Sequence, residues 1–423
     1  MNLHLSARER LGVAALGVVA LVGLVFGWRL LWFLTDDAFI AFRYVSNSVL
    51  GYGYVWNPPP FRPVEGYTSF LWVLLLDVVW RVSGMQPPVA ANRLALIFAA
   101  INSILTLLML LQAAGGRLRP WRLPLAALAL LGVLTNRTFL AWTSSGLETA
   151  LFNCLVTAWV FSAVVLPAGQ LRWLAALSVT AALSALTRPD GLLLVAATVG
   201  LVGLALAGAA QSKRPLFQRG AVAAPLLLVP IHLAWRYLTY GAWLPNTYYA
   251  KSATTLNRIE SGSRYLRSFV VEYALWCWIA LALAWAILLL VRLRPQRPRL
   301  PDLHQFAIAA VVLTLAAHLL YYTYLIGGDH FEFRVYSHLI PLLAVAGVAM
   351  LASLRLPPPA ALGILALAIA LSWPIPWLHW AESQAYTTRK QTHLFKLSVA
   401  DALERRQPEA PGWLLSYLRA YDA

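Results

Sequence analysis

Long apolar stretches recur along the chain from Leu11 almost to Leu378, and short polar segments separate them. Many approach the roughly 20 residues that a helix needs to cross a hydrocarbon core of about 30 Å. In lipid only a helix or a closed barrel satisfies its own backbone hydrogen bonds. We therefore predict about eleven membrane-spanning helices: Leu11–Phe33, Val89–Ala113, Leu123–Thr135, Leu147–Leu166, Leu171–Thr187, Leu192–Ala210, Ala221–Tyr240, Phe269–Arg292, Phe306–Ile326, Val335–Leu354 and Ala360–Leu378.

The composition supports an all-α polytopic membrane bundle and excludes an ordinary soluble domain. Hydrophobic residues make up 60% of the chain and charged residues 12%, about half the share that is usual in soluble proteins. The net charge of +16 comes from basic residues scattered in loops between the apolar stretches. A lipid bilayer is therefore the predicted surrounding, and nucleic acid is not a predicted partner. The two cysteines lie inside apolar stretches and define no disulfide framework.

The segment Phe70–Trp80 decides the predicted topology. It is shorter than the ~17 residues usually needed to cross, and it contains Asp77. If it does not cross, the basic loops fall on the cytoplasmic side, as the positive-inside rule requires. We therefore expect a juxtamembrane helix over 70–80 that follows an external loop over 34–69. The N-terminus is then cytoplasmic, and the tail over 379–423 is external.

This topology places an unusual share of the acidic residues at one face of the membrane: Asp36, Asp37, Glu65, Asp77, Glu148, Asp190, Glu260, Asp329 and Glu332. Asp36 and Asp37 directly follow the first predicted span. Adjacent carboxylates repel each other, which suits one of them to accept a proton in catalysis. The alternative interpretation is a solvated helix end.

Several motifs, in a fixed order, resemble the GT-C superfamily of glycosyltransferases that use polyprenyl-phosphate sugars. They are Ala38–Tyr44, Gly51–Pro58, Val64–Ser69, Ser145–Thr149, Thr187–Gly191, Leu244–Lys251 and Gly327–His330. Within the superfamily the chain is similar to bacterial arabinofuranosyltransferases of the mycobacterial terminal β-(1→2) type and the pilin type. The resemblance implies a catalytic domain over 1–378. The external tail over 379–423 is shorter than the C-terminal domain of the mycobacterial enzyme.

The resemblance also implies an activity and its partners. We expect transfer of D-arabinofuranose from a polyprenyl-phosphate donor to a cell-envelope glycan or pilin acceptor, at the periplasmic face of a bacterial inner membrane. Asp36 and Asp37 are the expected catalytic residues, and Asp36 aligns with the catalytic position. The expected substrate-binding or donor-binding residues are Arg43, Glu65, Glu148, Arg188, Asn246, Tyr248, Tyr249, Lys251, Asp329, His330 and Arg334.

Some of these residues have alternative interpretations. The planar fork of Arg188 suits a lipid-linked phosphate, but Arg188–Gly191 is also typical of a tight turn. Glu148 could interact only with the dipole of the helix that it precedes. The segment containing Tyr248, Tyr249 and Lys251 equally fits an aromatic belt at the membrane surface.

Other functions receive less support from the sequence. A nucleotide-sugar site is not indicated, because no P-loop or dinucleotide-binding motif is present. Asp329 and His330 without further ligand spacing are weak evidence for a metal; we predict no metal ligands and leave a divalent cation open. His232 and His318 fit core histidines. The rivals are a polyprenyl-phosphate-mannose-type enzyme and a flippase, which would have ionisable residues in mid-helix and two related halves.

Overall fold

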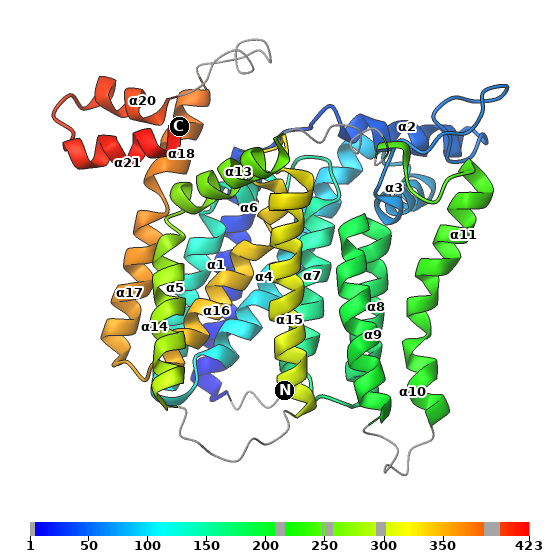
Figure 1. Ribbon diagram of the computed structural model, residues 1–423. Helices are drawn as coiled ribbons and strands as arrows, with labels where there is room; N and C mark the ends of the chain where they lie inside the picture. The colour runs from blue at the N-terminus through cyan, green and yellow to red at the C-terminus, as the bar shows by residue number, and fades with distance from the viewer. Residues whose placement is uncertain are drawn as a thin grey trace.

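The computed structural model describes residues 5–207, 216–247, 249, 257–292, 302–384 and 398–422, and these ranges contain helices and no strand. Long helices run side by side in a bundle, with the N-terminus at its lower end in Figure 1. The short helices α2 (Ala38–Val49), α6 (Arg137–Ala141) and α13 (Arg258–Glu272) lie at the opposite, upper end. We call this the upper end of the bundle throughout.

Six helical segments of the described ranges are long and apolar enough to cross a membrane, or seven if one bent pair counts as a span. They include α1 (Ala7–Leu30), α4 (Pro87–Ala113) and α9, which begins at Leu192 and ends at Ala207. Three shorter apolar helices accompany them: α7 (Thr149–Val165), α8 (Leu171–Thr187) and α16 (Leu339–Ser353). The predicted multi-pass helical fold is therefore confirmed, whereas the number eleven stays a prediction.

Local signals explain where several helices begin and end. A capping box between Ser6 and Glu9 starts α1, and another between Asp302 and Gln305 starts α15 (Leu303–Leu320). Gly84, in the left-handed conformation, ends α3 (Phe70–Ser83). At 14 residues, α3 is shorter than the roughly 17 residues usually needed for a span, as expected for a juxtamembrane helix.

The predicted span Phe269–Arg292 is wrong as a single helix. The structure has α13 and α14 (Trp276–Arg292) instead, bent by 89° at the break. Ala274 at the corner has a φ of +47°, which no α-helix accommodates. The corner keeps α13 at the upper end and leaves only α14 to run down the bundle (Figure 1).

Prolines mark changes of helix within two other predicted spans, and each range is still long and apolar enough to cross a membrane. The range Ala221–Tyr240 consists of α10 (Leu216–Ala223), the 3₁₀ turn η4 (Ala224–Leu227) and α11 (Leu228–Tyr240), with Pro225 in the turn. Similarly, α17 (Pro358–Leu371) ends before α18 (Pro374–Ser383). Each proline removes a backbone donor and restricts the preceding residue.

The segment over 34–69, expected to be loop, contains the amphipathic helix α2. Its buried residues Ala38, Ala41, Phe42 and Val45 follow the i, i+3, i+4, i+7 pattern of one helical face. This face joins a cluster with Trp72 of α3 and with residues of α4 and α7. The packing holds the segment over 34–69 against the bundle.

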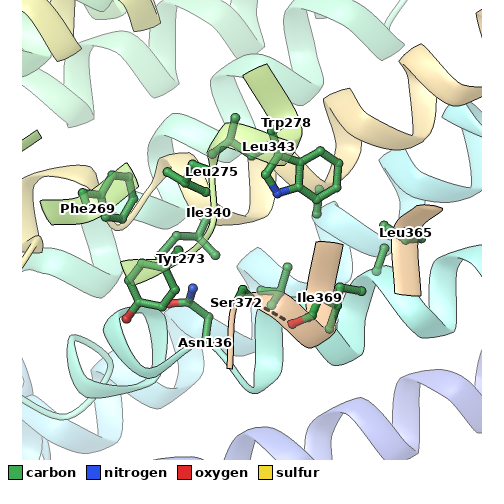
Figure 2. A pocket seen from close by; sticks show the side chains of 14 residues that line it. Asn136, Phe269, Tyr273, Leu275, Trp278, Ile340, Leu343, Leu365, Ile369 and Ser372 are labelled. Atoms are coloured by element: carbon green, nitrogen blue, oxygen red, sulfur yellow. Dashed lines mark hydrogen bonds between the residues drawn. The ribbon is translucent and has the colours of Figure 1, made fainter. Parts of the chain in front are cut away.

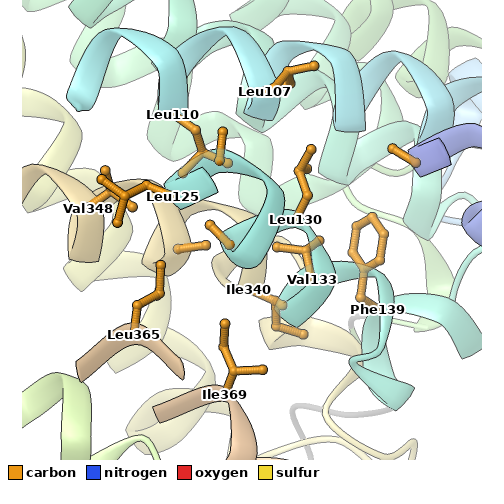
Figure 3. Packing of buried hydrophobic residues seen from close by; sticks show 14 of the residues in the cluster. Leu107, Leu110, Leu125, Leu130, Val133, Phe139, Ile340, Val348, Leu365 and Ile369 are labelled. Atoms are coloured by element: carbon orange, nitrogen blue, oxygen red, sulfur yellow. The ribbon is translucent and has the colours of Figure 1, made fainter. Parts of the chain in front are cut away.

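The largest apolar core joins α4, α5 (Arg122–Leu134), α16 and α17. Figure 3 shows its side chains, with leucines of α4 and α5 facing Val348 of α16 and Leu365 of α17. Small residues allow close helix contact in a membrane, where apolar packing against lipid gives little net gain. A Cβ at Gly27 of α1 would lie 2.7 Å from Leu140, for example.

A small cavity of about 50 Å³ lies at the upper part of this core. Figure 2 shows Tyr273 and Phe269 at one side and Trp278, Leu365 and Ile369 at the other. Its lining is mostly apolar, as expected for a packing gap at membrane depth.

The predicted tail is partly helical. The helix α18 extends past residue 378, and α20 (Val399–Arg406) and α21 (Gly412–Asp422) follow it. Tyr417 of α21 donates a hydrogen bond of 2.9 Å to the Val271 carbonyl, which attaches α21 to α13. The tail therefore packs on the upper end of the bundle.

Candidate functional site

The two adjacent carboxylates that follow α1 face different surroundings. Asp36 is exposed and lines an open cleft of about 510 Å³. Asp37 directly precedes α2, and its Oδ2 lies 3.7 Å from Nε2 of His330. One carboxylate thus faces open space, and the other faces the turn that follows α15.

That turn is the predicted Gly327–His330 motif. Gly327 and Gly328 both have φ near +90°, a conformation that side chains disfavour. The side chain of Asp329 is buried; its carboxylate accepts a hydrogen bond of 2.9 Å from Nε of Arg334 and lies 3.2 Å from Nδ1 of His330. Burial alone would raise the pKa of Asp329, but the hydrogen bond from His330 and the charge of Arg334 outweigh it and lower the pKa to about 2. Asp329 is therefore a carboxylate at neutral pH.

The segment over 34–69 and the turn over 327–334, called the late turn below, therefore meet, although nearly 300 residues separate Asp37 from His330. Four charged or polar side chains lie in a continuous row here: Asp37, His330, Asp329 and Arg334. The side chain of His330 is more than half exposed, whereas that of Arg334 is mostly covered. Such a row can bind a polar, anionic ligand near two carboxylates.

The cleft beside Asp36 has walls from α2 and from the segment that follows it. Arg43 donates a hydrogen bond of 2.8 Å from Nε to the Trp56 carbonyl, and its guanidinium lies 5.1 Å from the Trp56 ring centroid. The Asn47 amide also donates to the carbonyls of Val55 and Trp56, at 2.7 and 3.0 Å. These contacts fix the walls, so the cleft is already formed.

Arg188 is buried and has three partners. Its Nε lies 3.1 Å from Asp190, its Nη1 3.3 Å from Glu148, and its Nη2 donates to the Tyr322 hydroxyl at 2.6 Å. Phe152 packs against the guanidinium as well. The guanidinium of Arg188, which was predicted to bind phosphate, thus contacts two carboxylates of the protein. Glu148 pairs with Arg188 and makes no capping hydrogen bond with the helix that it precedes.

Asp190 connects this cluster to the interior. Its Oδ2 lies 2.6 Å from Nε2 of His318, and the His318 ring contacts His338. His318 is therefore a buried, partnered histidine, as expected from the sequence. His232 is also buried, and its ring packs against Phe70.

Glu65 is not among the residues that line the Asp36 cleft, and it joins the segment over 34–69 to α11. Its carboxylate pairs with Nε of Arg236 at 2.8 Å, and its carbonyl accepts a hydrogen bond from the Asn246 backbone. Burial raises the pKa of Glu65 to about 7, although the positive charge of Arg236 acts in the opposite direction. Glu65 and Asn246 thus sit in a connection between two elements.

The remaining predicted residues follow Asn246 in the sequence. Tyr249 is exposed, with 48% of its surface accessible. Tyr248 and Lys251 lie outside the described residues. The belt and site interpretations of this segment both remain predictions.

Sequence reasoning missed several buried charged residues. Arg137 of α6 pairs with Glu332 in the turn, and its Nη2 lies 3.9 Å from Glu272 of α13. Glu272 fell inside a predicted span, where an acidic residue is itself a sign of function or of an error in the span. Tyr322 and Arg236 carried no sequence signal beyond being polar groups in apolar stretches.

In the described ranges, no group of three or more His, Cys, Asp or Glu residues is arranged to hold a metal ion. The groups brought together are instead carboxylates, guanidinium groups and one exposed imidazole. They can accept a proton, bind an anion and form hydrogen bonds with hydroxyls.

Fold and site define an all-helical, multi-pass membrane protein with a polar site at the upper end. No family model and no curated protein matches the chain. Among solved structures, it is similar to the crystal structure of ArnT from Cupriavidus metallidurans bound to undecaprenyl phosphate. The TM-score is 0.53 at 14% sequence identity, and the match covers 97% of this chain and 74% of that one. This likeness shows the fold alone: the multi-pass helical arrangement is shared with that protein.

Proposed function

We propose that this protein is a membrane glycosyltransferase that transfers a sugar from a polyprenyl-phosphate donor, with D-arabinofuranose as the sugar and a cell-envelope glycan or pilin as the acceptor. The observation that carries the proposal is the meeting of Asp37 with His330, Asp329 and Arg334 beside the open Asp36 cleft. The fold shared with a protein solved with undecaprenyl phosphate supports a lipid-linked donor.

In this proposal Arg334 binds the donor phosphate. Among its contacts with described residues, its hydrogen bond to Asp329 uses only Nε. The terminal nitrogens can then give the bidentate hydrogen bonds that phosphate favours. The positive charge of Arg188 also acts on Asp329, the partner of Arg334, and Lys251 is a further candidate from the sequence.

The proposed chemistry is a single displacement. Asp36 or Asp37 accepts the proton of an acceptor hydroxyl, whose oxygen attacks the anomeric carbon of the donor sugar. The bond from that carbon to the phosphate oxygen breaks, and polyprenyl phosphate leaves with the electron pair without needing an acid. General-base assistance is typically worth roughly 10²–10⁴-fold in rate. His330 contacts Asp37 and Asp329, and in this way it orients Asp37.

The test is to incubate the purified protein with a panel of polyprenyl-phosphate sugars and to measure release of polyprenyl phosphate, with and without a divalent cation. Polyprenyl-phosphate arabinofuranose should give the fastest release, and a mannose donor tests the rival enzyme. Asp302→Asn is the matched control, because Asp302 caps α15 at the lower end and Asn is an equally good cap. Translocation of an intact lipid-linked sugar without release would show a flippase instead.

A further inference from the structure

A buried ion cluster beside the proposed site connects three separate elements. Arg137 of α6 pairs with Glu332 of the late turn, and Glu272 at the end of α13 lies 3.9 Å from Arg137. Arg137 is 7% exposed and Glu272 is fully buried. Charges buried in this way are expensive to desolvate, so the ion pairs by themselves are weak evidence for a stabilising role.

The backbone beside Arg137 is fixed from α13. The backbone N–H of Thr138 donates to the Tyr273 hydroxyl at 3.0 Å, and the Thr138 hydroxyl lies 2.7 Å from the same oxygen. On its other side, Tyr273 lines the small cavity of Figure 2. Arg137 therefore projects from a point that cannot shift without breaking these bonds.

The segment that Arg137 holds has additional anchors. The Trp142 indole N–H donates to the Glu332 carbonyl at 2.8 Å, and the Tyr265 hydroxyl donates to the Phe331 carbonyl at 3.0 Å. Phe333 has a φ of +44°, a conformation that costs a non-glycine residue free energy. Strain of this kind persists only where the surroundings impose it, and it is characteristic of functional sites.

His330 precedes this anchored segment directly and reaches Asp37, so its position depends on the segment. We propose that Arg137 is a positioning residue: by pairing with Glu332 and Glu272, it holds the late turn so that His330 stays beside Asp37 in the reactive geometry. The inference rests on the proposed function. Arg137 itself touches neither carboxylate of the first external segment.

The test compares Arg137→Met with Arg122→Met in the donor assay. Arg122 is an equally buried arginine that pairs with Glu9 at 2.6 Å, between α1 and α5 at the lower end. Both variants should lower the thermal midpoint. Only Arg137→Met should lower kcat, by roughly 10²-fold for a displacement of about 1 Å, with little change in KM for the donor. Arg137→Lys should restore part of kcat.

A double-mutant cycle separates positioning from simple loss of stability. If Arg137 acts through His330, Arg137→Met should lower kcat little further in a His330→Ala background. Equal losses in both backgrounds, or an equal loss of kcat in Arg122→Met, would overturn the proposal. Glu332→Gln carries the same test if Arg137→Met does not fold, since Glu332 is one-third exposed. Absence of release by the wild-type protein with every donor would instead refute the proposed function.

Discussion

Replacing Arg188 with alanine should destabilise the protein strongly, whatever its part in donor binding. The change removes the only positive charge that contacts both Glu148 and Asp190 within the described part of the chain. These carboxylate side chains are 9% and 1% exposed, so water cannot replace the guanidinium. Removing one partner of a buried ion pair typically costs about 3–5 kcal/mol, and we expect a loss in that range. Arg188→Lys should recover only part, because an ammonium group cannot reproduce three divergent contacts.

The assay is thermal unfolding of the detergent-solubilised protein, followed by donor binding below the melting range. Arg172→Ala is the matched control, because Arg172 is an exposed arginine at the start of α8, the helix that Arg188 directly follows. Its loss should shift stability by no more than about 0.5 kcal/mol. Adding Glu148→Gln to Arg188→Ala should restore some stability by neutralising one orphaned charge. A wild-type melting curve for Arg188→Ala would refute the reasoning that Arg188 stabilises the protein by compensating two buried carboxylates. Wild-type donor affinity in Arg188→Lys would mean that residues other than Arg188 bind the donor phosphate.

Three further outcomes are expected. Donor affinity should persist in both Asp36→Asn and Asp37→Asn, and the variant that removes the base should lose roughly 10²–10⁴-fold in turnover. Near-normal turnover in both variants would exclude this carboxylate pair from the chemistry. In a background without native cysteines, a reporter cysteine at Ser83 should react from outside and one at Gln170 should not, and the reverse result would mean that α3 crosses the membrane. Ionisation of Glu65 is disfavoured in the folded state, since its pKa rises from an ordinary 4.5 to about 7. Wild-type stability relative to Glu65→Gln should therefore fall by roughly 3 kcal/mol as pH rises from 4.5 to 7 and then level off; a pH-independent difference would contradict this.

Much of the fold was predictable because the membrane imposes strong local constraints. Apolar stretches such as Leu171–Thr187 coincide with α8, since helix formation and burial in lipid both follow from local sequence. The amphipathic helix α2 was also predictable from local sequence but was overlooked. Its apolar residues Ala38, Ala41, Phe42 and Val45 have the spacing of one helical face. The corner at Ala274 was predictable only in part: Glu272 inside a predicted span was a sign of an error there, but nothing local marks Ala274 as a left-handed residue.

The site divides in the same way. The sequence alone identified the acidic first segment and the Gly327–His330 turn, since charged residues at membrane edges are rare and must be compensated. Only the tertiary structure decided which groups these charged residues contact: Asp37 lies beside His330, Arg188 lies between two carboxylates, and Arg137 pairs with Glu332. A charge near lipid requires a counter-charge, but local sequence does not specify which one, because helix packing brings together residues that lie tens to hundreds of positions apart.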